Sequence, residues 1–324
     1  MKSARLLGLL VIACALSALP LYAAATGHFE RTLQVSGPVD LEVTSGSGNI
    51  TVHQGGNGTV YVAAKIRVSN SWLFGGDEED KVRRIEKNPP IEQQGNTIRI
   101  GRIDDHELIR HISIDYDVTV PAQTHLSAQT GSGDQTITGL QLPVTAKTGS
   151  GNVTVQNLGS EAHLSAGSGD MKIDSVKGTL VANTGSGNIR ANDVGGEISL
   201  NTGSGNVEAH QSAAGDVRVE TGSGNIRLYG IKGGLRASAG SGDIHAEGDA
   251  THDWRLGAGS GNITLRLPTN ASFNLDARTS SGTLRVRPPV TMQGGISKNH
   301  IQGKVGSGGA IVDVHTGSGD IEID

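Results

Sequence analysis

The chain has 324 residues, of which 48 are glycine and only 3% are aromatic, and its formal net charge is −5 at pH 7. This charge argues against a surface for nucleic acid, which would need a basic stripe of lysine and arginine. The glycine content exceeds that of ordinary globular domains. The scarcity of aromatic residues indicates a narrow core of small and branched aliphatic side chains.

Residues 1–25 have the three parts of a secretory signal peptide. Lys2 and Arg5 supply the positive start, residues 6–19 the apolar core, and Ala23-Ala24-Ala25 the cleavage site. We therefore expect an exported protein, in the periplasm, on the outer surface or outside the cell, with a mature chain that begins near Thr26.

The single cysteine, Cys14, leaves a second interpretation of this segment open. Val11-Ile12-Ala13-Cys14 resembles the motif at which bacterial lipoproteins are cleaved and lipid-anchored. The following stretch to Ala25 stays apolar, however, where a lipoprotein begins a polar tether, so ordinary cleavage is favoured. The mature chain would then contain no cysteine and no disulfide. No later apolar run reaches the ~18 residues that a membrane span needs.

Residues 26–120 are predicted to form an N-terminal β region with one helical insertion. Alternating apolar residues indicate strands between 28 and 70, and a helix is expected at 77–87. In that helix Glu79 with Arg83 and Asp80 with Arg84 are spaced i,i+4 with the acid first, which stabilises helices. Pro89-Pro90 then ends it.

Trp72, Leu73 and Phe74 form an apolar cluster just before this helix. Such side chains would cover the open end of a repeat structure, where core residues would otherwise meet water. The alternative is an exposed patch that binds a partner.

From Gly131 to about Thr279 the pattern Gly-Ser-Gly-[Asn/Asp]-apolar-x-apolar recurs eight times. The opening glycines stand at 131, 149, 167, 185, 203, 222, 240 and 259, which gives a period of 18 or 19 residues. A fixed short period is typical of a solenoid, in which each unit buries its apolar face against its neighbours. Each unit carries two alternating runs and no helical run, so residues 121–324 are predicted to form an all-β, elongated parallel β-solenoid.

Aligning the units separates inward from outward positions, because successive strand residues face opposite sides. One inward column comprises Ile137, Val155, Ile173, Ala191, Ala209, Leu228, Ala246 and Leu265. The outward column beside it comprises Thr154, Lys172, Arg190, Glu208, Arg227 and His245. Many inward residues are small, so the coil should be flattened around a thin core.

The turn after each Gly-Ser-Gly is predicted to carry a structural ladder. Glycine on both sides of the serine allows positive φ there. The polar residues that follow should stack from coil to coil, and they are Asn152, Asp170, Asn188, Asn206, Asn225, Asp243 and Asn262.

Residues 280–324 depart from this rhythm, with Pro288-Pro289 as an interruption and later Gly-Ser-Gly triplets at 306 and 317. The chain ends on Asp320-Ile321-Glu322-Ile323-Asp324. Alternating acids on a last strand discourage pairing at a sheet edge. We therefore interpret this segment as an irregular C-terminal cap.

The segment Ile114-Asp115-Tyr116-Asp117-Val118-Thr119-Val120-Pro121, followed by Leu126 to Asp134, resembles the bacterial family of "putative adhesins", which is also known as a domain of unknown function. The resemblance covers nearly all of residues 29–324. It implies an envelope or secreted β-solenoid and brings no catalytic residues with it.

Three specific site chemistries find little support in the sequence. Calcium binding by the glycine-rich turns would need several carboxylates at each site, and most turns carry Asn. The dense titratable stretch of residues 104–111 is expected to be a solvated loop rather than a metal or acid–base site. An ice-binding face would need a flat double row of threonines, whereas Thr130, Thr148, Thr184, Thr202 and Thr221 form a single column at a turn.

The sequence therefore predicts a non-catalytic, adhesin-like interaction or structural scaffold, with no cofactor and no metal. Its partner is expected to be a glycan or an envelope or surface protein of unknown identity. The alternative is a carbohydrate-active lyase or hydrolase on a β-helix, which would need carboxylates converging on adjacent coils. The outward columns do not gather such a cluster.

Overall fold

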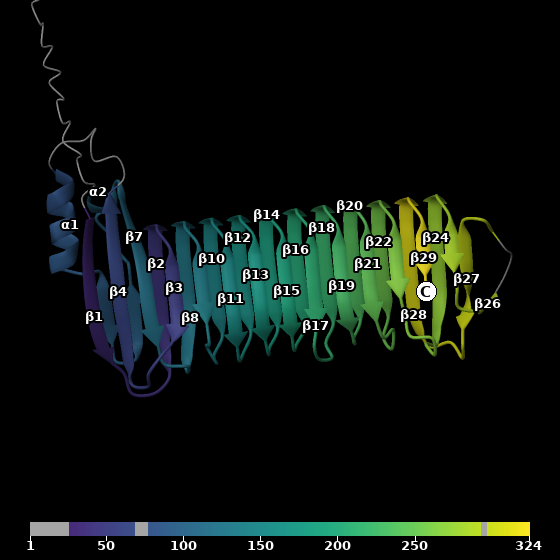
Figure 1. Ribbon diagram of the computed structural model, residues 1–324, viewed down its shortest axis with the longest axis horizontal. Coiled ribbons are helices and arrows are strands. Elements are labelled where there is room, and N and C mark those ends of the chain that lie inside the picture. Colours follow the sequence, from purple (N-terminus) through teal and green to yellow (C-terminus); the bar gives the residue numbers. More distant parts are fainter. Residues whose placement is uncertain (1–25, 69–76, 293–296) are drawn as a thin grey trace, which may run out of the picture.

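The computed structural model describes residues 26–68, 77–292 and 297–324. These residues form an elongated β-solenoid in which two long, largely parallel sheets face one another (Figure 1). The all-β fold class predicted from the sequence is confirmed. We call the 14-stranded sheet the first sheet and the 15-stranded sheet the second sheet.

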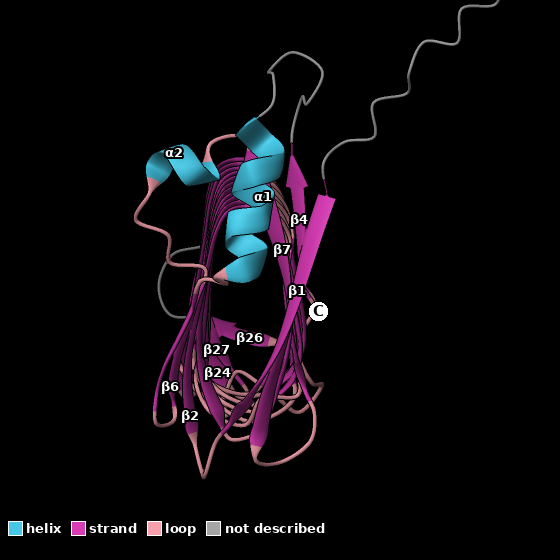
Figure 2. Cartoon of the chain, turned by 90° about the vertical axis from the view of Figure 1, so that its left-hand side faces the viewer, coloured by secondary structure: helices cyan, strands magenta, loops and turns pink. Residues whose placement is uncertain are grey.

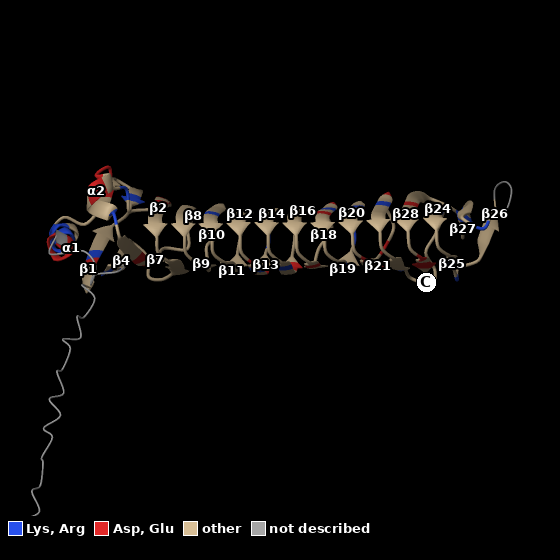
Figure 3. Cartoon of the chain, turned by 90° about the horizontal axis from the view of Figure 1, so that it is seen from above, with Lys and Arg blue, Asp and Glu red and all other residues tan. Residues whose placement is uncertain are grey.

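Each turn of the coil, here called a rung, contributes one strand to each sheet, and the two sheets form two facing rows when seen from above (Figure 3). In the regular region the second sheet contains β8 (Thr124–Ser132), β10 (Val144–Ser150), β12 (Ala162–Ser168), β14 (Leu180–Ser186), β16 (Ile198–Ser204), β18 (Val217–Ser223), β20 (Leu235–Ser241) and β22 (Trp254–Ser260). The first sheet contains β9 (Gln135–Thr138), β11 (Val153–Leu158), β13 (Met171–Val176), β15 (Ile189–Val194), β17 (Val207–Gln211), β19 (Ile226–Ile231), β21 (Ile244–Gly248) and β23 (Ile263–Arg266).

Neighbouring rungs are parallel and in register, so equivalent residues of the repeat lie side by side. On the first sheet Val155 lies beside Ile137 and Ile173, and all three are fully buried. On the second sheet Ala146 lies beside Leu164, which is also buried. The predicted inward columns therefore form the core, and each rung is stabilised by apolar contacts with the rungs on both sides.

The N-terminal end adds antiparallel strands to this stack. The remaining strands before the regular region are β1 (Thr26–Gln34), β2 (Val39–Ser47), β3 (Ile50–Gln54), β4 (Thr59–Val68), β5 (Ile91–Gln94), β6 (Thr97–Ile100) and β7 (Ile112–Val120). Strands β2 and β3 form a rung that pairs directly with β8 and β9. Both sheets thus continue without a break from the N-terminal region into the regular repeat.

Helix α1 (Asp77–Lys87) lies across the N-terminal end of the solenoid (Figure 2). Its Val82 and Ile85 are buried in the core, and its Glu86 accepts a hydrogen bond from the backbone N–H of His28 at 2.9 Å. A Cβ at Gly27 would collide with Val82, so glycine permits this close approach. The helix covers core residues that β1, the outermost strand of the first sheet, would otherwise expose to water.

The predicted helix at 77–87 is confirmed, but one of its two predicted ion pairs is wrong. Arg83 approaches Glu79 at 3.4 Å and also Asp80 at 3.1 Å. Arg84 instead lies 3.7 Å from Asp105, which caps a second, four-residue helix, α2 (His106–Ile109). The segment 104–111, which the sequence predicts to be a loop, therefore contains a helical turn. The carboxylate of Asp105 in this segment pairs with Arg84 in place of Asp80.

Six strands follow the regular rungs in the described part of the chain, and the last two are threaded into the stack rather than added at its end. The six are β24 (Phe273–Ser281), β25 (Leu284–Val286), β26 (Val290–Met292), β27 (His300–Val305), β28 (Ala310–Ser318) and β29 (Ile321–Ile323). Strand β28 lies between β22 and β24, and β29 lies between β23 and β25. The last rung of the chain is therefore an interior rung, and the interpretation of its final strand as a charged edge is wrong.

Candidate functional site

The predicted ladder residues lie in one row at the corner where each rung passes from the second sheet to the first. Each side-chain oxygen accepts a hydrogen bond from the backbone N–H of the ladder residue one rung further on. Asp170, for example, accepts from Asn188 at 2.7 Å, and Asn152 accepts from Asp170 at 3.0 Å. The same bond continues along the row to Asn206, Asn225, Asp243 and Asn262.

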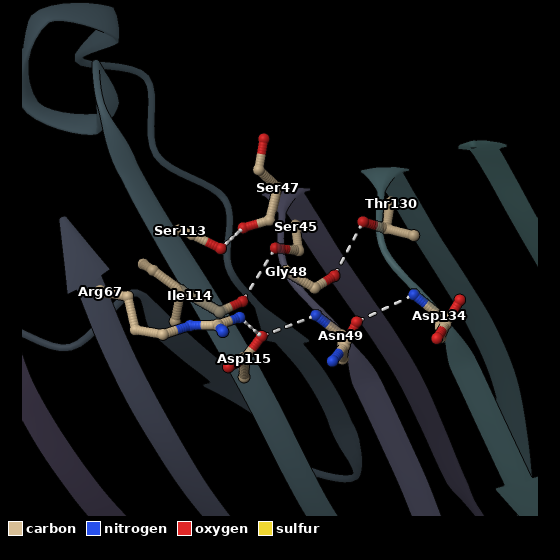
Figure 4. Close-up of polar contacts among 10 residues, drawn as sticks. All are labelled: Ser45, Ser47, Gly48, Asn49, Arg67, Ser113, Ile114, Asp115, Thr130 and Asp134. Atoms are coloured by element: carbon tan, nitrogen blue, oxygen red, sulfur yellow. Dashed lines mark hydrogen bonds and ion pairs between the residues drawn. The ribbon is translucent and has the colours of Figure 1, made fainter. Parts of the chain in front are cut away.

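The row is longer than the sequence indicated, at both ends. At the N-terminal end Asp115 accepts from the N–H of Asn49, and Asn49 accepts from that of Asp134, both at 2.9 Å (Figure 4). Arg67 approaches the same Asp115 oxygen at 2.6 Å and so balances its charge. At the other end Asn262 accepts from Asp320 of the last rung.

Asp320 ends the ladder in a distinctive electrostatic position. Its carboxylate accepts hydrogen bonds from both the backbone N–H and the hydroxyl of Thr283, at 2.8 and 2.9 Å. These bonds favour the ionised form and hold the pKa of Asp320 below its usual range. The ladder fixes the rung register and leaves its charged groups engaged within the chain.

The threonine column lies inside the turn. Thr202 is only 1% exposed, and its hydroxyl donates to the carbonyl oxygen of Gly187 on the preceding rung at 2.9 Å. Thr148, Thr184 and Thr221 make the same bond. These threonines are unavailable to ice or to any surface ligand, and they act as a second internal ladder.

A cluster of rings lies on the outer face of the first sheet, on three successive rungs. Tyr229 of β19 stacks on His210 of β17, with ring centroids 4.5 Å apart and an angle of 21° between the planes. On the other side His245 of β21 lies 5.6 Å from Tyr229, at 51°. Aromatic residues are scarce in this chain, so three rings on an outer face are an unusual grouping. We call His210, Tyr229 and His245 the ring cluster.

Charged side chains frame the ring cluster. Glu208 accepts contacts from Arg190 and from His210 on its two carboxylate oxygens, each at 3.5 Å. Partial burial, followed by the positive charge of Arg266, lowers the pKa of His245 and so favours the neutral form of its imidazole. The face thus combines flat apolar rings with donors and acceptors fixed at their edges.

Two shallow depressions flank the ring cluster on the same face. One, of about 430 Å³, runs along the ladder side and is bordered by Arg190, Glu208 and Arg227. The other, of about 360 Å³, is bordered by Glu247 and Arg266. Together the rings and the two depressions form a strip on which an extended ligand could lie along the face. Aromatic and arginine side chains, which this strip contains, are enriched in binding interfaces.

A larger cavity, of about 700 Å³, lies near the C-terminal end and includes Leu267, Phe273 and Arg287 in its lining. Its arginine is already paired, with Glu322 at 3.1 Å and Asp324 at 3.0 Å. The ring cluster is therefore the better candidate for recognising a polar ligand.

Two further groups of residues singled out in the sequence are the apolar cluster at 72–74 and the outward column that contains His245. Trp72, Leu73 and Phe74 lie outside the described residues. The sequence predicts an outward position for His245 but does not indicate its grouping with His210 and Tyr229. Aligning the repeats two positions beyond Glu208 and Arg227 would have found two of the three rings, since β17 and β19 are in register there.

Three solved structures from bacteria match across most of the chain. They are a "putative cell adhesion protein" of Clostridium sporogenes (11% identity, 92% of this chain and 99% of that one, TM-score 0.22), a "putative adhesin" of Bacteroides fragilis (12%, 92% and 97%, 0.31) and a "putative adhesin" of Parabacteroides distasonis (13%, 91% and 97%, 0.27). No curated protein matches the chain significantly.

The family model "Toastrack DUF4097" matches residues 38–196 and again residues 184–324. These two matches together cover every strand from β2 onward, which confirms the resemblance carried by residues 114–134. The chain therefore belongs to the Toastrack DUF4097 family.

Proposed function

We propose that this protein is a non-catalytic, exported scaffold of the cell envelope or surface that holds a glycan or a surface protein on the outer face of its first sheet. The ring cluster carries the proposal. Tyr229 lies between the imidazoles of His210 and His245, so the outward edges of the three rings form an apolar strip against which a sugar ring or an apolar side chain can pack. Glu208, Arg190 and Arg227 supply hydrogen-bonding groups beside it.

The hydrogen bonds made by polar groups elsewhere in the solenoid support a scaffold role. Ladder carboxylates and buried threonine hydroxyls are used for bonds between rungs, which gives a rigid rod with an evenly spaced surface. A surface of this kind favours weak contacts repeated along an extended ligand. The rod also needs no internal motion to present its face.

Export is supported by the first 25 residues, with their positive start, apolar core and alanine cleavage site. Neither helix in the described ranges is long or apolar enough to cross a bilayer. Mass spectrometry of the mature protein tests export. An N-terminus at or near Thr26 supports signal cleavage, whereas a lipidated Cys14 would show an anchored protein instead.

A glycan array and a pull-down from envelope extract test the binding role. Tyr229→Ala should weaken binding at least about tenfold, because a central aromatic anchor carries much of the energy of an interface. Tyr61→Ala is the matched control, since Tyr61 is 36% exposed on β4 and far from the ring cluster along the stack. Equal binding by both variants, or equal loss in both, would refute a site at the ring cluster.

A further inference from the structure

The second sheet carries three arginines side by side on its outer face. Arg218, Arg236 and Arg255 belong to β18, β20 and β22, and the strand register places Arg236 directly beside each of the other two. All three are exposed. Neighbouring strands lie about 4.8 Å apart, so the backbone holds three like charges in a short, straight row. We call these residues the arginine row.

The charges of the arginine row are incompletely balanced within the described part of the chain. Arg218 has an ion pair, with Glu220 at 2.7 Å. Arg236 and Arg255 form neither an ion pair nor a side-chain hydrogen bond with any described residue. Like charges directly opposite one another destabilise a sheet. The fold therefore accepts a cost at Arg236, which has a like charge directly beside it on both sides.

The acids beside the row are engaged elsewhere. Asp216 accepts the backbone N–H of Gly234 at 2.9 Å, and Asp253 accepts that of Ile311 at 2.9 Å. The next rung beyond Arg255 carries Asp313, which lies 3.3 Å from Arg278.

The imidazole of His315, on the same rung as Asp313, packs over Gly257 close to Arg255, and a Cβ on Gly257 would lie only 2.7 Å from it.

A shallow depression of about 400 Å³ runs along the arginine row, and Glu197, Asp216 and Asp253 also line it. A guanidinium binds a carboxylate or sulfate through two parallel hydrogen bonds. The acids in the same depression can accept hydrogen bonds from hydroxyl groups. A ligand that fits both features carries anionic groups at about the spacing of neighbouring strands and hydroxyl groups between them.

We infer that the arginine row binds an acidic polysaccharide, with anionic groups on Arg236 and Arg255 and sugar hydroxyls on the neighbouring carboxylates. The site lies on the opposite face of the solenoid from the ring cluster. It therefore goes beyond the proposed function and does not depend on Tyr229.

Binding of polygalacturonate, which carries carboxylates, and of heparin, which carries sulfates, tests this site with dextran as the neutral polymer. Whichever acidic polymer binds identifies the anionic group. The double variant Arg236→Gln/Arg255→Gln should bind it about tenfold more weakly and with a flatter dependence on salt. The control is Arg99→Gln/Lys147→Gln, which removes the same charge from the same sheet at β6 and β10. This control and Tyr229→Ala should both retain binding.

Four outcomes would overturn the inference. They are binding of neither acidic polymer, equal binding of dextran, equal loss in the control double variant, and tighter binding of polyglutamate or polyphosphate than of both polysaccharides. The stability of the free protein gives an independent readout. Replacing Arg236 and Arg255 should leave the unfolding midpoint unchanged or raise it, because repulsion is relieved. A lowered midpoint would assign the arginines a structural role instead.

Discussion

The carboxylate of Asp170 accepts a hydrogen bond from the backbone N–H of Asn188, 18 residues later in the chain and one rung further along the rod. This bond closes one period of the repeat, because both residues occupy the same position after Gly-Ser-Gly. Its repetition from rung to rung holds the corner of the solenoid in register.

Asp170→Asn should be nearly neutral, since an amide oxygen can accept the same bond. Asp170→Ala should lower the free energy of unfolding by about 0.5–1.5 kcal/mol, the net value of a solvent-accessible hydrogen bond. Asn183→Ala is the control, because Asn183 is exposed on β14 and is not in the ladder. Urea unfolding measures all three. Equal losses for Asp170→Ala and Asn183→Ala would contradict a specific role for the ladder.

The threonine column has gaps that allow a stabilising substitution. Ala239 occupies this column on β20, beside Thr221, and is 2% exposed. A threonine there would place its hydroxyl near the carbonyl of Gly224, the partner expected from the neighbouring rungs. We expect Ala239→Thr to raise stability by about 0.5–1 kcal/mol. Thr202→Val should lower it by about 1 kcal/mol, while Thr136→Val on the exposed side of β9 should change little. A destabilising Ala239→Thr would show that the column has no room for the extra atoms.

His245 should titrate at a lower pH than an ordinary histidine. Its folded-state pKa is lowered, first by partial burial and then by Arg266. The folded state therefore prefers the neutral imidazole. The resulting contribution to the free energy of unfolding is fully present above the unfolded-state pKa of about 6.5 and is lost as pH falls through the folded-state pKa. NMR titration of the imidazole measures it. Arg266→Gln should raise the pKa without restoring its usual value, and Arg278→Gln on the other sheet should leave it unchanged. A normal pKa in the unmodified protein would be inconsistent with this environment.

The threaded last rung makes the end of the chain part of the core. Ile321 of β29 is fully buried between β23 and β25, whereas Ile311 of β28 is 46% exposed. Ile321→Ala should cost about 2–5 kcal/mol of stability, and Ile311→Ala less than about 0.5 kcal/mol. Hydrogen exchange should also show that Ile321→Ala loosens both neighbouring rungs. A small effect confined to β29 would indicate that the last rung is a dispensable addition.

The sequence predicted the regular part of this fold because an 18-residue period places equivalent residues on top of one another. Ile137, Val155 and Ile173 could be assigned to one buried column from spacing alone. The threading of the last rung could not be predicted in this way. Its Gly317-Ser318-Gly319-Asp320 has the same form as the other turns, and nothing in that motif says which rungs it will separate.

Other features depend on contacts that the repeat does not specify. Asp115 belongs to β7, which runs parallel to β3 but has no Gly-Ser-Gly before it, so the repeat motif does not reveal its place at the start of the ladder. Ser175 adopts a left-handed conformation, with φ of 59°, at a corner where other rungs use asparagine, aspartate or glycine. The ring cluster arises from residues that differ from rung to rung, which a search for what repeats overlooks.

The fate of a bound glycan tests the central claim most directly. The protein is incubated at length with the array glycan that it holds most tightly, and the glycan is then analysed by mass spectrometry. A non-catalytic scaffold predicts that the glycan is recovered intact and that its binding requires Tyr229. Shortened or unsaturated products that form with the unmodified protein and disappear with Glu208→Gln would contradict this account and show a carbohydrate-active enzyme instead.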